Sequence, residues 1–200
     1  MVSRIFFAGG SNNRRWLSSD GVMPLRQEAS VHADDRSRFL QPPSIAAVCA
    51  GIAAGVLSTL AQLALWWLFT DSLPGILFRD ARLAAAIVMG PEVLPPAHGF
   101  DAAVMAVATI VHFALSIAYG LALWPLIATL RMRAALVVGA AFGLALFMLN
   151  MYGFTIVFPW FEVARDGITA AAHVAFGVSA AGVFKLLSAR RADRSARPAR

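Results

Sequence analysis

The fold of this chain is decided by residues 102–128, which read AAVMAVATIVHFALSIAYGLALWPLIA. The stretch contains no Asp, Glu, Lys or Arg and lies between Asp101 and Arg131. A helix needs about 20 mostly apolar residues to cross the roughly 30 Å hydrocarbon core of a bilayer, so this segment is long enough to span a membrane. Its continuous Ala- and Leu-rich composition favours a helix over the short alternating strands of a membrane barrel.

Three further uncharged stretches of similar length occur in the chain, which places the expected spans near 44–70, 102–128, 134–158 and 167–187. The composition agrees, because 59% of the residues are apolar and 14% are charged, against about 45–50% and about 25% in soluble domains. A soluble chain of 200 residues needs a larger polar surface, so soluble enzyme folds are excluded. The sequence predicts an all-α, polytopic membrane protein with four transmembrane helices.

The segments outside the spans complete the expected organisation. Residues 1–43 are polar and are expected to form a disordered cytoplasmic tail, followed by a four-helix transmembrane domain at 44–187 and a basic cytoplasmic tail at 188–200. In the first outer loop, Ile76–Met89 favours a short interfacial helix with its charged side toward water, and an ordinary loop is the alternative. No secretory signal is expected near the N-terminus, and translation from Met23 is an alternative start.

Motifs of enzymatic chemistry are missing from the sequence. It contains no HExxH, no Walker-type Gly-Lys-Ser/Thr and no Gly-x-Ser-x-Gly motif, so a hydrolase or NTPase would lack its nucleophile or phosphate cradle. Cys49 is the only cysteine, so it has no partner for a disulfide or a metal pair, and it is expected to be a small core residue. We expect the chain not to be an enzyme.

Basic residues set the expected orientation. Fourteen of the 17 lie in the N-terminal tail, in the turn at 129–133 or at the C-terminal end, whereas the other two connections hold only Arg79, Arg82 and Arg165. The positive-inside rule therefore predicts that both termini are cytoplasmic. The C-terminal arginines follow a span directly, so anionic lipid headgroups are their expected partner rather than nucleic acid, at about 1 kcal/mol per basic residue.

One polar residue lies at a similar depth in each expected span; these are Gln62, His112, Asn150 and His173. At about 1.5 Å per residue they lie roughly 9–15 Å from the outer ends of the spans, so they could form one layer. Ser116 and Tyr119 follow His112 at i+4 and i+7 and share its helical stripe, which would face the bundle. We call these six residues the polar layer.

Three interpretations of the polar layer stay open. It could hold the bundle together through interhelical hydrogen bonds, each worth about 0.6 kcal/mol and at most about 2. It could instead line a small oligomeric proton or cation pathway, since histidines titrate near neutral pH and Glu162 and Asp166 precede the fourth span. A third alternative is b-type haem ligated by His112 and His173. No metal site and no other cofactor is expected.

Two pairs of glycines form small faces on the first and third spans: Gly51 with Gly55, and Gly139 with Gly143. Small residues four apart let helix backbones approach closely where lipid supplies no hydrophobic drive for association. We expect these faces to pack within the chain, and a homo-oligomer is the alternative.

Several of these segments resemble a family of small bacterial inner-membrane proteins of the YagU type. The resemblance covers roughly 44–187 and rests on the segment from Gly51 to Ser58, on His112 through Gly120, and on Phe158–Phe161 leading to His173. It implies a multi-span protein of the bacterial inner membrane, associated with acid resistance rather than with a defined reaction. The residues it carries over are His112, His173 and the Pro159–Trp160 corner.

Proteins of this kind are sometimes named sodium:proline symporters. Four spans show neither the two matching halves nor the interrupted helices that midplane binding sites of such symporters usually need.

Reporter fusions test the predicted orientation. Alkaline phosphatase fused after Glu92 or after Asp166 should be active, because both connections are expected outside, and a fusion after Arg191 should be inactive. Activity of the Arg191 fusion would overturn the four-span topology with cytoplasmic termini.

Overall fold

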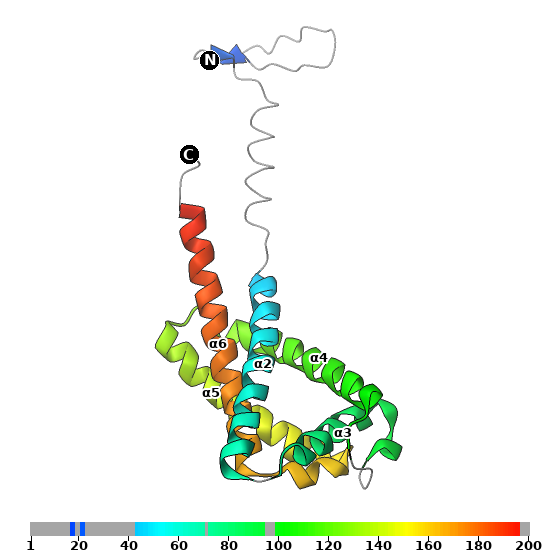
Figure 1. Ribbon diagram of the computed structural model, residues 1–200. Coiled ribbons are helices and arrows are strands. Elements are labelled where there is room, and N and C mark those ends of the chain that lie inside the picture. The colour runs from blue at the N-terminus through cyan, green and yellow to red at the C-terminus, as the bar shows by residue number, and fades with distance from the viewer. Residues whose placement is uncertain (1–16, 19–20, 23–42, 71, 95–98, 197–200) are drawn as a thin grey trace, which may run out of the picture. The chain divides into compact units, whose positions relative to one another are not determined.

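The computed structural model describes residues 17–18, 21–22, 43–70, 72–94 and 99–196 (Figure 1). The chain divides into two units, Met1–Pro42 and Pro43–Arg200. In the first unit, β1 (Leu17–Ser18) and β2 (Gly21–Val22) pair antiparallel. Of the tail expected at 1–43, Pro43 already belongs to the first helix of the second unit, and the remaining residues apart from β1 and β2 lie outside the described part.

The second unit is built from helices: α2 (Pro43–Phe69), α3 (Gly75–Met89), α4 (Ala102–Ile127), α5 (Met132–Met148) and α6 (Gly167–Ala196). Four stretches are long and apolar enough to cross a membrane: Ser44–Phe69, Ala102–Ile127, Met132–Ile156 and Gly167–Ala192. The predicted all-helical fold with four such helices is confirmed. Short 3-10 helices connect them, among them η1 (Pro91–Val93) and η4 (Pro159–Ala164).

The last helix is longer than expected. The fourth span is expected to end near 187, whereas α6 continues to Ala196. Residues 183–197 contain neither glycine nor proline, so nothing in the covalent chain stops the helix earlier. The first part of the basic segment 188–200 is therefore helical, and its last four residues lie outside the described part.

The helices α2, α6 and α5 form a layer in which α6 packs against both of the others. Helix α4 packs mainly against α2 and runs obliquely away from it toward α3, which packs against α4 (Figure 1). Alanines dominate the largest core cluster, and five larger side chains fill it: Leu123, Ile127, Leu146, Phe176 and Phe184. Small residues at the contacts allow this close approach of backbones, which favours dispersion contacts in lipid.

The small face of α2 lies against α4. A Cβ atom on Gly55 would lie 2.7 Å from Ser116 Oγ, and one on Gly120 would lie 2.8 Å from Ala47 O. Gly51 likewise faces the backbone of Ser116. These residues therefore set the crossing point of α2 and α4.

The small face of α5 lies against α6. A Cβ atom on Gly143 would collide with the carbonyl oxygen of His173, and one on Gly139 would collide with that of Gly177. All four glycines of the two expected small faces are buried against neighbours of the same chain.

Cys49 was expected in the core, and this expectation is wrong. Its side chain is exposed on α2, while Ala46, Ala47 and Ala50 on the same helix are buried. Only a narrow strip of α2 faces the core. The neighbouring helices approach this strip so closely that alanine side chains fill the space between the backbones.

Helix α3 occupies the position expected for the short interfacial helix, but one of its charged residues faces inward. Arg82 is 7% exposed, and its guanidinium donates from Nη1 to Val93 O at 3.0 Å. It thereby satisfies a carbonyl of the segment that returns to α4. Arg79 pairs with Asp80 at 2.7 Å, and burial raises the pKa of Asp80 although Arg79 acts to lower it.

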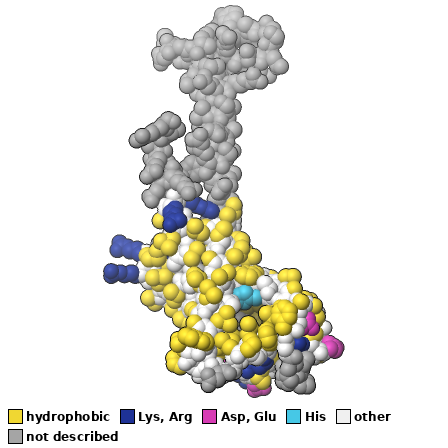
Figure 2. All heavy atoms as spheres, viewed as in Figure 1, with side chains coloured by type: hydrophobic (Ala, Val, Ile, Leu, Met, Phe, Trp, Pro, Cys, Tyr) yellow, Lys and Arg dark blue, Asp and Glu magenta, His cyan; other side chains and the backbone are white. Residues whose placement is uncertain are grey.

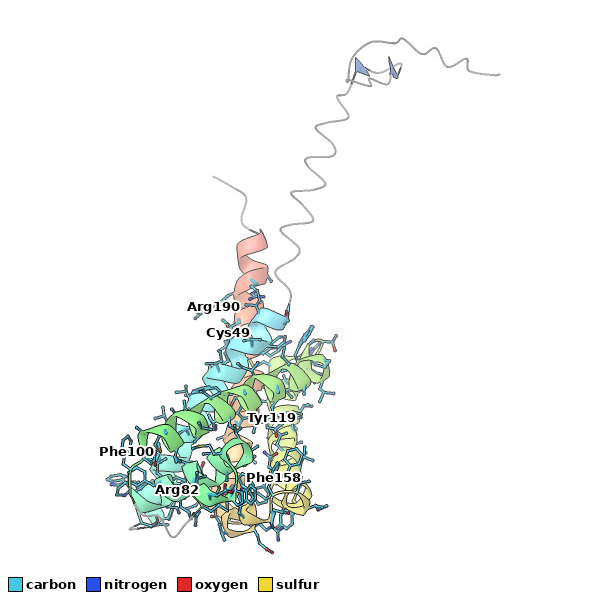
Figure 3. All side chains as sticks on the ribbon, turned by 90° about the vertical axis from the view of Figure 1, so that its right-hand side faces the viewer. Cys49, Arg82, Phe100, Tyr119, Phe158 and Arg190 are labelled. Atoms are coloured by element: carbon cyan, nitrogen blue, oxygen red, sulfur yellow. The ribbon has the colours of Figure 1, made fainter. Side chains whose placement is uncertain are left out.

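Charge is distributed unequally between the two ends of the helical unit. Arg131 and Arg133 follow the C-terminus of α4, which lies against Lys185 of α6, and Arg190 lies further along α6. Figure 2 shows basic side chains at this end and acidic side chains toward the other end. Figure 3 shows the same two ends of the unit, with Cys49 and Arg190 at one end and Arg82, Phe100 and Phe158 at the other. Lys185 donates to Ala128 O at the C-terminus of α4, at 3.1 Å, where a cation complements the helix dipole.

The α5–α6 contact predicts a position-dependent effect of a bulky side chain. Gly143→Leu should lower the free energy of unfolding by about 1–3 kcal/mol, because the side chain would force the two backbones apart. Gly75→Leu is the control, because a Cβ atom there meets nothing within 4 Å. Thermal unfolding in detergent measures both variants. Equal loss of stability would contradict the packing described above.

Candidate functional site

The six residues of the polar layer all line one cavity of about 150 Å³. The other lining residues are Ser58, Leu115, Leu146, Ala172 and Phe176. The wall thus draws on α2, α4, α6 and the α5 segment. Its volume has room for several water molecules or a small ligand group.

Asn150 reaches the cavity from an irregular turn of helix. After Met148, α5 passes into a π-helical turn, η2 (Leu149–Gly153), and then into the 3-10 helix η3 (Phe154–Ile156). π-Helical turns are rare and are frequent at functional sites. Arg165 stabilises this turn by donating from Nε to Met151 O at 2.6 Å and from Nη2 to Thr155 Oγ1 at 2.8 Å.

A chain of hydrogen bonds connects three of the four spans. Tyr119 on α4 donates its hydroxyl hydrogen to Asn150 Oδ1 at 2.8 Å. Asn150 Nδ2 lies 3.2 Å from Nε2 of His173 on α6. His173 Nδ1 lies 2.8 Å from the carbonyl oxygen of Thr169, one turn earlier on the same helix.

The direction of this chain is fixed by its last acceptor. A backbone carbonyl can only accept, so Nδ1 of His173 carries the proton and donates to Thr169 O. In the neutral ring Nε2 is then the acceptor, and it takes a hydrogen from the Asn150 amide. The amide oxygen is left to accept from Tyr119, so every bond in the chain is satisfied.

His112 makes a separate connection between α4 and α2. Its Nε2 lies 3.2 Å from Gly55 O and 3.3 Å from Thr59 Oγ1. Ser58 and Thr59 also donate to Gly55 O, at 3.1 and 2.9 Å. The acceptor is a carbonyl, so Nε2 of His112 donates, in contrast to Nε2 of His173.

Gln62 and Ser116 also line the cavity. Their side chains make no hydrogen bond to the part of the chain that the structure describes. The structure thus brings all six polar-layer residues to one cavity, but their side chains do not form a single hydrogen-bond network. Tyr119, Asn150 and His173 form one network, His112 bonds to α2, and the last two are unpaired within the described residues.

Sequence reasoning missed Thr59 and the carbonyls of Gly55 and Thr169. Thr59 precedes Gln62 by three residues and so shares its helix face, which was an available signal. Backbone carbonyls leave no signal in a sequence, because every residue carries one.

The arrangement gives haem little room. Nε2 of His112 and Nε2 of His173 are both within hydrogen-bonding distance of protein atoms, so ligation through them would break those bonds. A cavity of about 150 Å³ is also far smaller than a haem macrocycle. Within the described residues, no group of three or more His, Cys, Asp and Glu side chains could hold a metal ion.

The Pro159–Trp160 corner opens η4 and contacts α3 rather than the cavity. Trp160 Nε1 donates to Leu83 O at 3.0 Å, and Leu83 is buried with Phe147, Met151 and Ala164. This corner therefore joins the two connecting segments.

Comparison with protein-family models, curated proteins and solved structures finds no match to this chain.

The hydrogen-bond chain predicts unequal effects of removing its members. Asn150→Leu should lower the free energy of unfolding by about 1–2 kcal/mol, because it removes two bonds and leaves the partly buried side chains of Tyr119 and His173 unpaired. Tyr119→Phe removes one bond and should lower it by about 0.6 kcal/mol. Chemical unfolding in mixed micelles measures both.

Thr109→Val is the matched control for these variants. The Thr109 hydroxyl bonds to Met105 O within its own helix and is exposed, so stability should change little. If Asn150→Leu were no more destabilising than this control, the network would not stabilise the fold.

Proposed function

We propose that this chain is a non-enzymatic integral protein of the bacterial inner membrane whose polar layer holds the helices together. The observation that carries the proposal is the pair of connections made from α4: Tyr119 bonds to Asn150, and His112 bonds to Gly55. In hydrocarbon these groups have no water to bond with, so separating the helices would leave them unpaired.

The proposed orientation has both termini in the cytoplasm. The basic end of the helical unit, where Arg131, Arg133 and Arg190 follow the contact of Lys185 with the end of α4, would then face anionic headgroups of the inner leaflet. A role in acid resistance or another membrane stress is supported only by the resemblance to the YagU-type family. A homo-oligomer would have to use surfaces other than the four buried glycines.

A proton or cation pathway is the second candidate, and the cavity favours protons over other cations, because its lining includes two histidines and no acidic side chain. The two histidines and the unpaired Gln62 and Ser116 line the same space, which could hold water. The hydrogen-bond chain itself is a poor proton relay, because the amide of Asn150 stands between Tyr119 and His173. Conduction would therefore depend on water between His112 and His173.

Two substitutions at His112 separate these candidates. His112→Leu removes the bond to Gly55 and should lower the free energy of unfolding by about 1–2 kcal/mol. His112→Gln keeps an N–H donor but cannot gain charge between pH 5 and 8, so the melting temperature should change little.

Proteoliposomes under an imposed pH gradient supply the deciding readout. A structural role predicts that wild-type and His112→Gln proteoliposomes show the same proton leak as empty liposomes. Flux through the wild-type protein that disappears in His112→Gln would replace the structural proposal with the pathway.

A further inference from the structure

We propose that the cavity is a binding site for the uncharged, hydroxyl-bearing headgroup of a molecule dissolved in the bilayer. The proposal goes beyond the structural role of the polar layer. It concerns the donors and acceptors of the cavity wall that take no part in the hydrogen bonds between helices.

The cavity lies at the depth of the hydrocarbon core. Gln62 is seven residues before Phe69, the end of α2, which is about 10 Å along the helix. Figure 2 shows histidine atoms at the surface beside a hollow, surrounded by hydrophobic side chains, on the face where α2 and α4 diverge in Figure 1. A molecule in the lipid phase could therefore reach the polar interior from the side.

The cavity wall has no formal charge. None of its eleven lining residues is Asp, Glu, Lys or Arg. An ion entering it would lose its hydration without gaining a partner of opposite charge, which is strongly unfavourable at this depth. An uncharged group avoids this penalty, so the lining selects against carboxylates, phosphates and ammonium groups.

The unused hydrogen-bonding groups are mainly acceptors. Ser58 and Tyr119 donate their only hydroxyl hydrogens to Gly55 O and Asn150 Oδ1, so their lone pairs stay free. Gln62 contributes an unpaired carbonyl oxygen and amide, and Ser116 an unpaired hydroxyl. A ligand hydroxyl can donate to one of the free oxygens and accept from the Gln62 amide.

The remaining wall suits an apolar body attached to that headgroup. Leu115, Leu146 and Phe176 line the cavity, and Leu115 is 37% exposed. Apolar side chains beside the polar groups would contact the carbon atoms next to the hydroxyl while the chain of the ligand stays in lipid. An alcohol with one long alkyl chain has this chemistry.

Photolabelling of the full chain in phosphatidylcholine nanodiscs tests the proposal. The probe is a sixteen-carbon alcohol with a diazirine on its third carbon, compared with the amine and the carboxylic acid of the same length and diazirine position. The alcohol should label cavity-lining residues saturably, and unlabelled hexadecanol should compete. The amine and the acid should label only residues on the lipid-facing surface.

Two variants connect the labelling to the proposed contacts. Gln62→Leu and Ser116→Ala should each reduce saturable labelling by about tenfold, as expected for one lost hydrogen bond in the binding equilibrium. Both residues lack a hydrogen bond within the described chain, so the melting temperature of each variant should stay near that of the wild type. Thr109→Val, on the exposed face of α4, should leave the labelling unchanged.

Three results would overturn the proposal. Labelling by the alcohol that is not saturable and is unchanged in Gln62→Leu would mean that the cavity holds water only. Saturable labelling by the amine but not the alcohol would assign the site to cations. Loss of labelling together with a lowered melting temperature in both variants would assign Gln62 and Ser116 a structural role instead.

Discussion

A polar group inside a membrane must find its hydrogen-bond partner within the protein, and the arrangement of α4 depends on this constraint. Helix α4 packs closely on α2 around Ala47, Gly51 and Gly55 and then diverges from it toward α3. At the crossing, hydrogen bonds from His112 and Tyr119 connect it to α2 and to the α5 segment. Separating these side chains would leave them unpaired in hydrocarbon, so the bonds oppose further divergence.

Helix packing and the polar layer support one another through the glycines. Gly55 has no side chain, so His112 and Ser116 can approach its backbone, and its carbonyl becomes the acceptor for His112. Gly143 allows α6 to approach α5 at His173, which brings that histidine within reach of Asn150 two turns later. A larger residue at either glycine would displace both the backbone contact and the hydrogen bond beside it.

The number of long apolar helices and the meeting of the polar residues in one cavity could be predicted, because both follow from the length of uncharged stretches and the rise per residue. The bonding pattern could not be predicted. Asn150 faces His173 from a π-helical turn, and no local sequence motif predicts this turn. His112 bonds to a backbone carbonyl, which every residue carries. The inward position of Arg82 also depends on where the return segment places the carbonyl of Val93, a tertiary contact without a sequence signal.

The position of the proton on each of the two histidine rings is the most direct test of the hydrogen bonds that join the helices. Nitrogen NMR of histidine-labelled protein in bicelles at neutral pH distinguishes the two neutral forms of each ring. We expect a proton on Nδ1 of His173, because that atom donates to Thr169 O. We expect the proton of His112 on Nε2, because that atom donates to Gly55 O. A proton on Nε2 of His173 at neutral pH would contradict the hydrogen-bond chain that runs from Tyr119 through Asn150 to His173.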